Sequence, residues 1–343
     1  MSSFTVPSGA QRLDHFMAQA NARYYATASF LNDFVTAPEI SQVFGEILGA
    51  WAAMVWRGMN CPSSFVFAEA GPGRGTLMAD ALRLITRHVP DMAKAQQVHL
   101  IETSPLLREM QYQALCPYVV PFWHHHITTL PDMPLILLGN EFLDALPIRQ
   151  FIQKDAVWYE RYVCNGVFQL VSSAAPVLPD DRFLEADTIV ELCEPAIALV
   201  RWLSQRFIQI PGVALFIDYG HETLLTGDSL QALYHARPAS PLENAGKADL
   251  TAHVDFTALA AVARQVGAAV YGTETQGVFL QQLGFMERTE QLACRASLED
   301  AKILRKSAHR LVAAEEMGHL FKVMAFVSPF LPPPPGFVRK DNL

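Results

Sequence analysis

Charged residues are scarce in this sequence. Asp, Glu, Lys and Arg together make up 17% of its 343 residues, whereas hydrophobic residues make up 51%. A chain this apolar can bury a large core, so we expect little disorder outside its ends. The 26 Lys and Arg residues are outnumbered by 34 Asp and Glu, and no basic run offsets the net charge of −8. Because acidic surfaces repel phosphate groups, nucleic acid is excluded as an expected partner.

Paired cysteines and long apolar runs are missing as well. The five cysteines are scattered, and none has the Cys-x-x-Cys spacing typical of zinc sites and dithiol redox centres. No apolar run reaches the roughly 18 residues of a membrane helix, and the first residues lack the uninterrupted apolar core of a signal peptide. We therefore expect a cytoplasmic protein with no membrane span and no metal site.

Periodic patterns are plentiful and indicate an α/β protein. Apolar residues recur at helical spacing between Pro38 and Arg57, which predicts an N-terminal helical segment over residues 1–60. Further along, short apolar runs typical of buried parallel strands alternate with helical patterns. The predicted strands are residues 65–69, 98–102, 118–123, 135–138 and 213–218. This alternation predicts a Rossmann-like sheet with helices on both faces, in a domain spanning residues 61–330.

Two stretches do not fit a simple alternation of strands and helices. Residues between the fourth and fifth predicted strands alternate between apolar and polar, as at Phe151 and Tyr159, which predicts an inserted α+β subdomain at about residues 150–195. A second insertion, at about residues 222–260, is irregular and contains prolines. Consecutive prolines then precede a polar tail over residues 331–343.

A glycine-rich loop, residues 69–75, stands between the first predicted strand and the next helix. Gly71, Gly73 and Gly75 let the chain turn tightly and let a ligand approach the backbone beside a helix N-terminus. Glycine-rich turns also occur for purely structural reasons. In a dinucleotide fingerprint Thr76 would be the third glycine, which weakens a nicotinamide interpretation.

The electrostatics of this loop favour S-adenosylmethionine. Glu69, directly before the glycines, would repel a pyrophosphate but attract a ligand with a sulfonium and an amino group. We therefore assign Glu69, Gly71, Gly73, Gly75 and Thr76 to cofactor binding.

Polar residues that end the next strands complete the predicted cofactor site. Glu102 ends the second predicted strand, where a carboxylate can accept both ribose hydroxyls of an adenosine; the alternative is an exposed acid that caps the following helix. Asn140 follows the fourth predicted strand at the same edge and is assigned to the cofactor as well.

Four residues near this edge are candidates for catalysis. Glu141 could orient a cationic acceptor such as a guanidinium. Asp144 could support it or simply cap the next helix. Asp218 and His221 follow the fifth predicted strand, where either could accept the acceptor's proton, although an Asp at a strand end is equally typical of a turn.

Three consecutive histidines, residues 124–126, do not predict a metal site. Adjacent residues of a strand point to opposite faces, so the three side chains cannot readily converge on one ion. Trp123 and His124 are instead expected near the adenine of the cofactor.

With these residues in view, the chain resembles the MidA-like family of methyltransferases, whose mitochondrial members assist assembly of respiratory complex I. The matching segments are Tyr24 and Tyr25 and residues 33–46, 69–77, 140–147, 218–221 and 248–256, ending near Met317 and Gly318. Residues 26–32 depart from the family pattern, being shorter than the loop expected there.

The resemblance implies S-adenosylmethionine-dependent N-methylation of a protein arginine, with a complex I subunit as the expected substrate. The carboxylates available to hold a guanidinium are Glu39, Glu46, Glu141, Asp144 and Asp218. Two alternatives stay open. One is a non-catalytic assembly chaperone that binds S-adenosylmethionine, and the weaker one is a nicotinamide-dependent oxidoreductase with a similar sheet.

Overall fold

A computed structural model describes residues 6–27, 35–180, 187–222 and 227–337. The chain divides into two compact units. The larger unit comprises Val35–Phe142, Arg201–Gly220 and Ala263–Leu343, and the smaller unit comprises Met1–Phe34, Leu143–Val200 and His221–Val262. Residues 28–32 of the stretch that departs from the family pattern lie outside the described residues, as do Asp33 and Phe34 of the family segment and residues 338–343 of the predicted tail.

The larger unit is built on a mixed sheet. Its strands are β2 (Phe65–Ala70), β3 (Gln96–Ile101), β4 (Phe122–His124), β5 (Leu135–Asn140), β10 (Gly212–His221), β15 (Ala269–Thr275) and β16 (Phe321–Val327). They lie in the order β15-β16-β10-β5-β2-β3-β4. The strands from β10 to β4 are parallel, whereas β16 is antiparallel to both β10 and β15.

The order of the parallel strands creates a switch point between β2 and β5. From β2 the chain proceeds outward to β3 and β4, and it then returns to pair β5 with the other side of β2. In open α/β sheets, ligands bind beyond the carboxyl ends of the strands at such a reversal. Ala70 pairs with Gly139, so the residues that follow β2 and β5 emerge beside each other at that edge.

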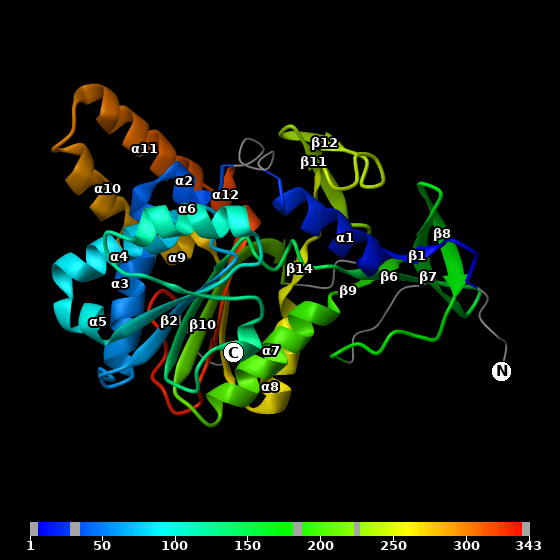
Figure 1. The fold of residues 1–343 in the computed structure, drawn as a ribbon, viewed down its shortest axis with the longest axis horizontal. Helices are drawn as coiled ribbons and strands as arrows, with labels where there is room; N and C mark the ends of the chain where they lie inside the picture. The colour runs from blue at the N-terminus through cyan, green and yellow to red at the C-terminus, as the bar shows by residue number, and fades with distance from the viewer. Residues whose placement is uncertain (1–5, 28–34, 181–186, 223–226, 338–343) are drawn as a thin grey trace. The chain divides into compact units, whose positions relative to one another are not determined.

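Helices alternate with the strands of this sheet along the chain, and Figure 1 labels most of them. Those of the larger unit are α2 (Ala37–Ile40), α3 (Gln42–Gly58), α4 (Thr76–His88), α5 (Pro90–Ala95), α6 (Pro105–Leu115), α9 (Gln276–Gln282), α10 (Phe285–Ala293), α11 (Leu298–Val312) and α12 (Met317–Leu320), with a 3-10 turn at Ile127–Thr129. Two more, α7 (Glu194–Phe207) and α8 (Phe256–Val266), contain positions at which the units divide. No described helix combines the length and hydropathy needed to cross a membrane.

A hydrophobic core holds the sheet of the larger unit against α3 and α4, which lie side by side in Figure 1. Phe65 and Phe67 of β2 contribute to it, with Ile136 and Leu138 of β5 and the fully buried Trp51 of α3. Complete burial of a large apolar side chain stabilises a fold by about 1.5–3 kcal/mol. The core therefore fixes the strands from which the loops of the switch point extend.

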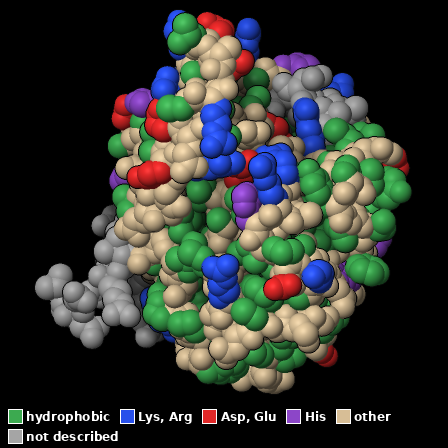
Figure 2. Space-filling view, turned by 90° about the vertical axis from the view of Figure 1, so that its left-hand side faces the viewer, with side chains coloured by type: hydrophobic (Ala, Val, Ile, Leu, Met, Phe, Trp, Pro, Cys, Tyr) green, Lys and Arg blue, Asp and Glu red, His purple; other side chains and the backbone are tan. Residues whose placement is uncertain are grey.

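Charged side chains of both signs are interspersed with hydrophobic ones on the face shown in Figure 2. Between α10 and α11, Arg305 pairs with Glu290 at 2.8 Å. Glu46 of α3 is buried and pairs with Arg83 at 2.9 Å and with Arg288 at 2.7 Å. Glu46, expected among the carboxylates that could hold an acceptor, is thus bound by two arginines that join α3 to α4 and α10.

The smaller unit contains two antiparallel sheets and helix α1 (Leu13–Tyr25). The first sheet has β1 (Gln11–Arg12), β6 (Arg149–Lys154), β7 (Val157–Cys164), β8 (Val167–Ser172) and β9 (Ile189–Leu192). Its order is β1-β7-β6-β9, with β8 also paired to β7. The second sheet has the order β12-β11-β13, formed by β11 (Gln231–Tyr234), β12 (Arg237–Ala239) and β13 (Asp249–Thr251), and a short strand β14 (Val254–Asp255) follows.

The predicted fold class is confirmed: a Rossmann-like α/β sheet with N-terminal helices and additional antiparallel sheets. Several element boundaries differ from the sequence prediction: β3 begins and ends earlier, β5 ends later, and β10 continues to His221. Two further differences have a local cause. The predicted third strand begins at Phe122 rather than Tyr118, because the N–H of Tyr118 closes a turn onto Leu115. The predicted helix over 38–57 is interrupted at Ser41, which is extended and whose side chain accepts a hydrogen bond from Val43, as an N-cap does.

Candidate functional site

The glycine loop after β2 takes a conformation that requires glycine. Gly71, Gly73 and Gly75 have φ angles of 65°, 52° and 84°, in the left-handed region that favours glycine. A Cβ on Gly71 would lie 2.8 Å from Cδ2 of Phe142, whereas one on Gly73 would meet nothing within 4 Å. The loop is therefore packed against protein at Gly71 and has open space at Gly73. A ligand can approach the backbone closely there, beside the start of α4 at Thr76.

Glu69 carries a buried carboxylate oxygen without a partner. The residue is 3% exposed, and Oε2 accepts no hydrogen bond from any described residue. Burial, with the nearby negative charge of Glu39, raises the pKa of Glu69 to about 8, although the backbone N–H of Met78 hydrogen-bonds the carboxylate and opposes the shift. Asn140, at the end of β5, has a similarly buried Oδ1, which also accepts no hydrogen bond within the described ranges of the chain.

These two oxygens test whether the site fits S-adenosylmethionine. A buried acceptor without a donor costs free energy, on the order of 1–3 kcal/mol, which a ligand with N–H donors and positive charge would recover. The amino acid part of the cofactor has an ammonium group, which supplies both. The residues present at the switch point therefore fit this cofactor.

Burial disfavours the charged form of the Glu69 carboxyl. Glu69→Gln is therefore expected to change how the free energy of unfolding depends on pH. From pH 4.5, the ordinary pKa of glutamate, up to about 8, the folded wild type keeps a proton that the unfolded chain releases. Wild-type stability should therefore fall relative to the variant as the pH rises through this window. Thermal melting of both proteins without cofactor between pH 5 and about 8.5 measures the difference. Parallel curves would show that Glu69 ionises normally.

Glu102, directly after β3, is buried rather than exposed, at 8% exposure. Its Oε1 accepts hydrogen bonds from the backbone N–H groups of Thr103 and Ser104, both at 2.7 Å, and its Oε2 accepts one from Gln111 at 3.2 Å. Burial raises the pKa of Glu102, and these hydrogen bonds oppose the shift. The carboxylate is thus held rigidly at the carboxyl edge of the sheet, where it can face a ribose.

Glu102→Ala is expected to lower the affinity for S-adenosylmethionine at least about tenfold, since two charge-assisted hydrogen bonds to ribose would be lost. Calorimetric titration measures this. Glu102→Gln is the matched variant, because an amide oxygen can still accept from Thr103 and Ser104 while the negative charge is gone. Unchanged affinity in a folded Ala variant would place the ribose elsewhere.

Gln111 is a site residue that the sequence did not reveal. It lies on α6 with no exposure, and its Nε2 donates to the carbonyl of Gly73 at 2.8 Å as well as to Glu102. Its Oε1 accepts from the indole N–H of Trp123 at 2.8 Å. One amide thus joins the glycine loop, the proposed ribose acid and the end of β4. A buried glutamine on a helix has no motif around it that could have indicated this role.

Of the three consecutive histidines, one contacts other side chains of the sheet and two are exposed to solvent. His124 lies 2.8 Å from His99, Nε2 to Nδ1, and its Nδ1 lies 2.7 Å from the hydroxyl of Thr129. His125 and His126 are exposed. His124 thus belongs to a side-chain pair within the sheet.

Glu141 directly follows β5, Asp218 lies in the last part of β10, and both carboxylates accept hydrogen bonds from backbone N–H groups. Glu141 has an uncommon φ of 50°, and its N–H donates to the carbonyl of Ile217 at 2.8 Å. Its Oε1 accepts from the N–H of Ala37 at 3.2 Å and from Nδ2 of Asn140 at 3.0 Å. Asp218, 1% exposed, accepts from the N–H of Phe142 at 3.1 Å through Oδ2 and from its neighbour's N–H through Oδ1.

Asp144 belongs to the smaller unit, where it is 6% exposed. Its carbonyl accepts from the N–H of Ala252 at 3.0 Å. Nearby, Tyr25 donates its hydroxyl to Asp249 at 2.7 Å. Burial, reinforced by the charges of Asp249 and Asp144, raises the pKa of Tyr25 well above its ordinary value. Two family segments, the tyrosine pair and residues 248–256, therefore meet beside Asp144.

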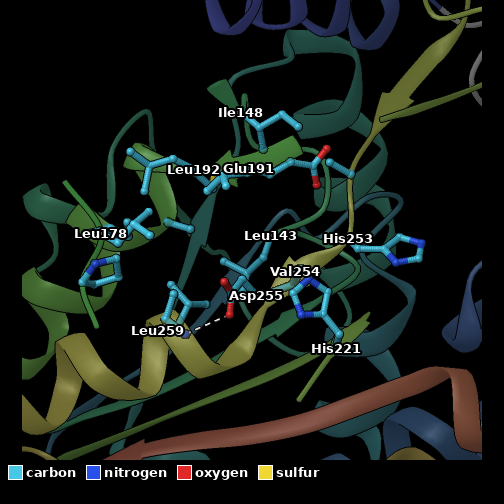
Figure 3. A pocket seen from close by; sticks show the side chains of 17 residues that line it. Leu143, Ile148, Leu178, Glu191, Leu192, His221, His253, Val254, Asp255 and Leu259 are labelled. Carbon is cyan, nitrogen blue, oxygen red and sulfur yellow. Dashed lines mark hydrogen bonds between the residues drawn. The ribbon is translucent and has the colours of Figure 1, made fainter. Parts of the chain in front are cut away.

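His221 lies in a pocket of the smaller unit, shown in Figure 3. The lining is largely apolar, including Leu143, Leu192 and Leu259, with His253 and Asp255 among the polar members. The carboxylate of Asp255 accepts from the N–H of Ala258 at 2.9 Å, at the start of α8. The structure thus brings Glu69, the glycines, Thr76, Glu102, Asn140, Glu141 and Asp218 together in the larger unit, and it places Asp144 and His221 in the smaller one.

Comparison with known proteins agrees with this geometry. Residues 47–274 match the family described as "Putative S-adenosyl-L-methionine-dependent methyltransferase". The protein arginine methyltransferase NDUFAF7 homolog, mitochondrial, of Drosophila melanogaster is 32% identical, over a match covering 92% of this chain and 80% of that protein. The human protein arginine methyltransferase NDUFAF7, mitochondrial, is 31% identical, with 89% and 76% covered.

Solved structures share the fold. A crystal structure of an uncharacterized protein from Burkholderia thailandensis superposes with a TM-score of 0.77 at 25% identity, covering 96% of this chain and 91% of that one. A second structure from the same organism, bound to S-adenosyl-homocysteine, gives 0.76 at 24% identity, with 96% and 90% covered. The chain therefore belongs to the MidA-like family of S-adenosylmethionine-dependent methyltransferases that its sequence motifs indicated.

Proposed function

We propose that this chain N-methylates an arginine side chain of a protein, and that the protein is a subunit of respiratory complex I. The observation that carries the arginine assignment is the presence of two acidic side chains at the carboxyl edge of the sheet: Glu141, directly after β5, and Asp218, in the last part of β10. A guanidinium needs carboxylates to hold it. The relatives named protein arginine methyltransferase support the acceptor class, and the complex I assignment follows from the MidA-like resemblance.

Each residue has a defined task in this reaction. When bound, S-adenosylmethionine supplies a methyl group made electrophilic by the sulfonium. Glu102 holds the ribose, and Gly73 lets the ligand reach the backbone. Glu141 orients the guanidinium so that one nitrogen presents its lone pair to the methyl carbon. Asp218 is the proposed acceptor for the proton that the methylated nitrogen would release.

Transfer of label from S-adenosylmethionine tests the proposal. Purified protein is incubated with methyl-labelled cofactor and complex I subunits, and labelled peptides are analysed by mass spectrometry. Methylarginine on one subunit, dependent on the enzyme, is the expected result. Label on another residue type would show that arginine is not the methyl acceptor. If the protein bound the cofactor but transferred no label, the alternative described next would be favoured.

The alternative is an assembly chaperone that binds S-adenosylmethionine without using it. The high apolar content and the additional sheets of the smaller unit favour it, since both suit a partner-binding protein. Complex I assembly in cells carrying only a cofactor-binding-deficient variant distinguishes the two. Fractionation of the same cells decides between the predicted cytoplasmic location and the mitochondrial location named for the relatives.

A further inference from the structure

We propose that Glu39, on α2, joins Glu69 in binding the ammonium group of the cofactor's amino acid part, and that Glu141 is a positioning residue for this pair. The inference rests on the proposed assignment of the β2–β5 edge as the cofactor site. It moves Glu39 from the acceptor side, where the sequence had suggested it, to the cofactor. The ligand chemistry is a primary ammonium on an amino acid, separate from the adenosine.

Contacts within the larger unit hold Glu39 beside the glycine loop. Its Oε1 accepts from the hydroxyl of Thr76 at 3.2 Å, and Thr76 is the first residue of α4, directly after Gly75. Its Oε2 accepts from the hydroxyl of Thr36, at the N-cap of α2. Two hydroxyls thus fix the carboxylate at the start of α4, close enough to Glu69 for the two charges to interact.

No Lys or Arg of the described residues compensates the two carboxylates. In the part of the chain that the structure describes, neither Glu39 nor Glu69 forms an ion pair with Lys or Arg. Glu69 is 97% shielded from solvent, and its Oε2 has no donor. Like charges in such a setting repel each other strongly, and a cation that both carboxylates bind removes the repulsion.

An ammonium group suits this set of acceptors. It has three N–H donors. The described residues offer three acceptors here: the unpartnered Oε2 of Glu69, the carboxylate of Glu39 and the unpartnered Oδ1 of Asn140. A sulfonium has no N–H and cannot satisfy them, so the amino end of the ligand fits better than its methyl-bearing sulfur.

Glu141 sets the positions of two of these acceptors. By accepting from the N–H of Ala37, its Oε1 joins the end of β5 to α2, the helix that carries Glu39. By accepting from Nδ2 of Asn140, the same oxygen orients that amide, whose Oδ1 is then the atom left for a ligand. Glu141 therefore acts on this subsite through its neighbours, without needing to touch the ammonium.

Two ligands separate this role from ribose binding. S-adenosylhomocysteine contains the amino acid part, whereas 5′-methylthioadenosine contains the same adenosine without it. Calorimetric titration of both ligands is carried out on the full-length wild type, Glu39→Gln, Glu102→Gln and Glu109→Gln. Glu109 is on the exposed surface of α6, so its variant removes an equal charge from the same unit.

Glu39→Gln is expected to weaken S-adenosylhomocysteine about tenfold or more, the loss of a charge-assisted hydrogen bond, with 5′-methylthioadenosine unaffected. Glu102→Gln should weaken both ligands, and Glu109→Gln neither. If Glu39→Gln lowered the affinity for both ligands equally, Glu39 would only support the fold. If it lowered the affinity for neither ligand, Glu39 would not belong to the cofactor site. Either result overturns the proposal. Glu39→Asp keeps the charge, so its affinity for S-adenosylhomocysteine should fall less than that of Glu39→Gln. None of these titrations depends on methyl transfer to arginine, so failure of the arginine assignment would be seen separately.

Discussion

Replacing Glu141 with glutamine is expected to lower the turnover of methyl transfer by ~10²-fold or more while leaving the affinity for S-adenosylhomocysteine near that of the wild type. Glutamine keeps an oxygen that can accept from Ala37 and Asn140, so α2 and the amide should stay in place. What disappears is the negative charge that, under the proposed function, would hold the guanidinium and increase electron density on the attacking nitrogen. The loss should therefore appear in the chemical step.

Single-turnover methylation and cofactor titration on the same preparation measure the two effects. Glu141→Ala is the contrasting variant, because it also removes the acceptor for the N–H of Ala37. Its affinity for the cofactor should fall as well, through displacement of α2 and Glu39. Wild-type turnover in Glu141→Gln, or a loss confined to cofactor affinity, would remove Glu141 from the acceptor site.

The second large effect is expected for Gly73→Asp, which should lower cofactor affinity ~10²-fold or more and abolish methyl transfer in a folded protein. Aspartate tolerates the φ of 52° better than most residues, and a Cβ at this position meets no protein atom within 4 Å. The fold should therefore accept the side chain. The space that it fills is the space in which the ligand would approach the backbone.

A matched control exists in the turn between β7 and β8. Gly166 has a φ of 74° and equally open surroundings, but it lies in the smaller unit. Gly166→Asp should bind S-adenosylhomocysteine as the wild type does. If Gly73→Asp also bound it normally, the glycine loop would not be the cofactor site.

Local sequence patterns predicted those parts of the fold that are determined by residues adjacent in the sequence. The N-terminal helix α3 follows from the helical spacing of its apolar residues, and the burial of β2 and β5 follows from their apolar runs. The loop over 69–75 was recognisable because glycine spacing reports backbone conformation directly. These features need no knowledge of what packs against them.

Features that depend on distant residues were not predictable. The antiparallel strand β16 is an apolar run whose place beside β10 is fixed only when the whole sheet forms. Glu39 and Thr76 are 37 positions apart, and nothing around either residue indicates their hydrogen bond. The role of Gln111 likewise appears only when β4, α6 and the glycine loop are assembled. Packing, rather than local preference, brings such residues together.

The most direct test of this account is a crystal structure of the protein with S-adenosylhomocysteine. The ribose hydroxyls should lie within hydrogen-bond distance of the Glu102 carboxylate, with the ligand passing over Gly73 and its ammonium facing Oε2 of Glu69. Density for the ligand away from the edge formed by β2, β3 and β5 would contradict the assignment of the site.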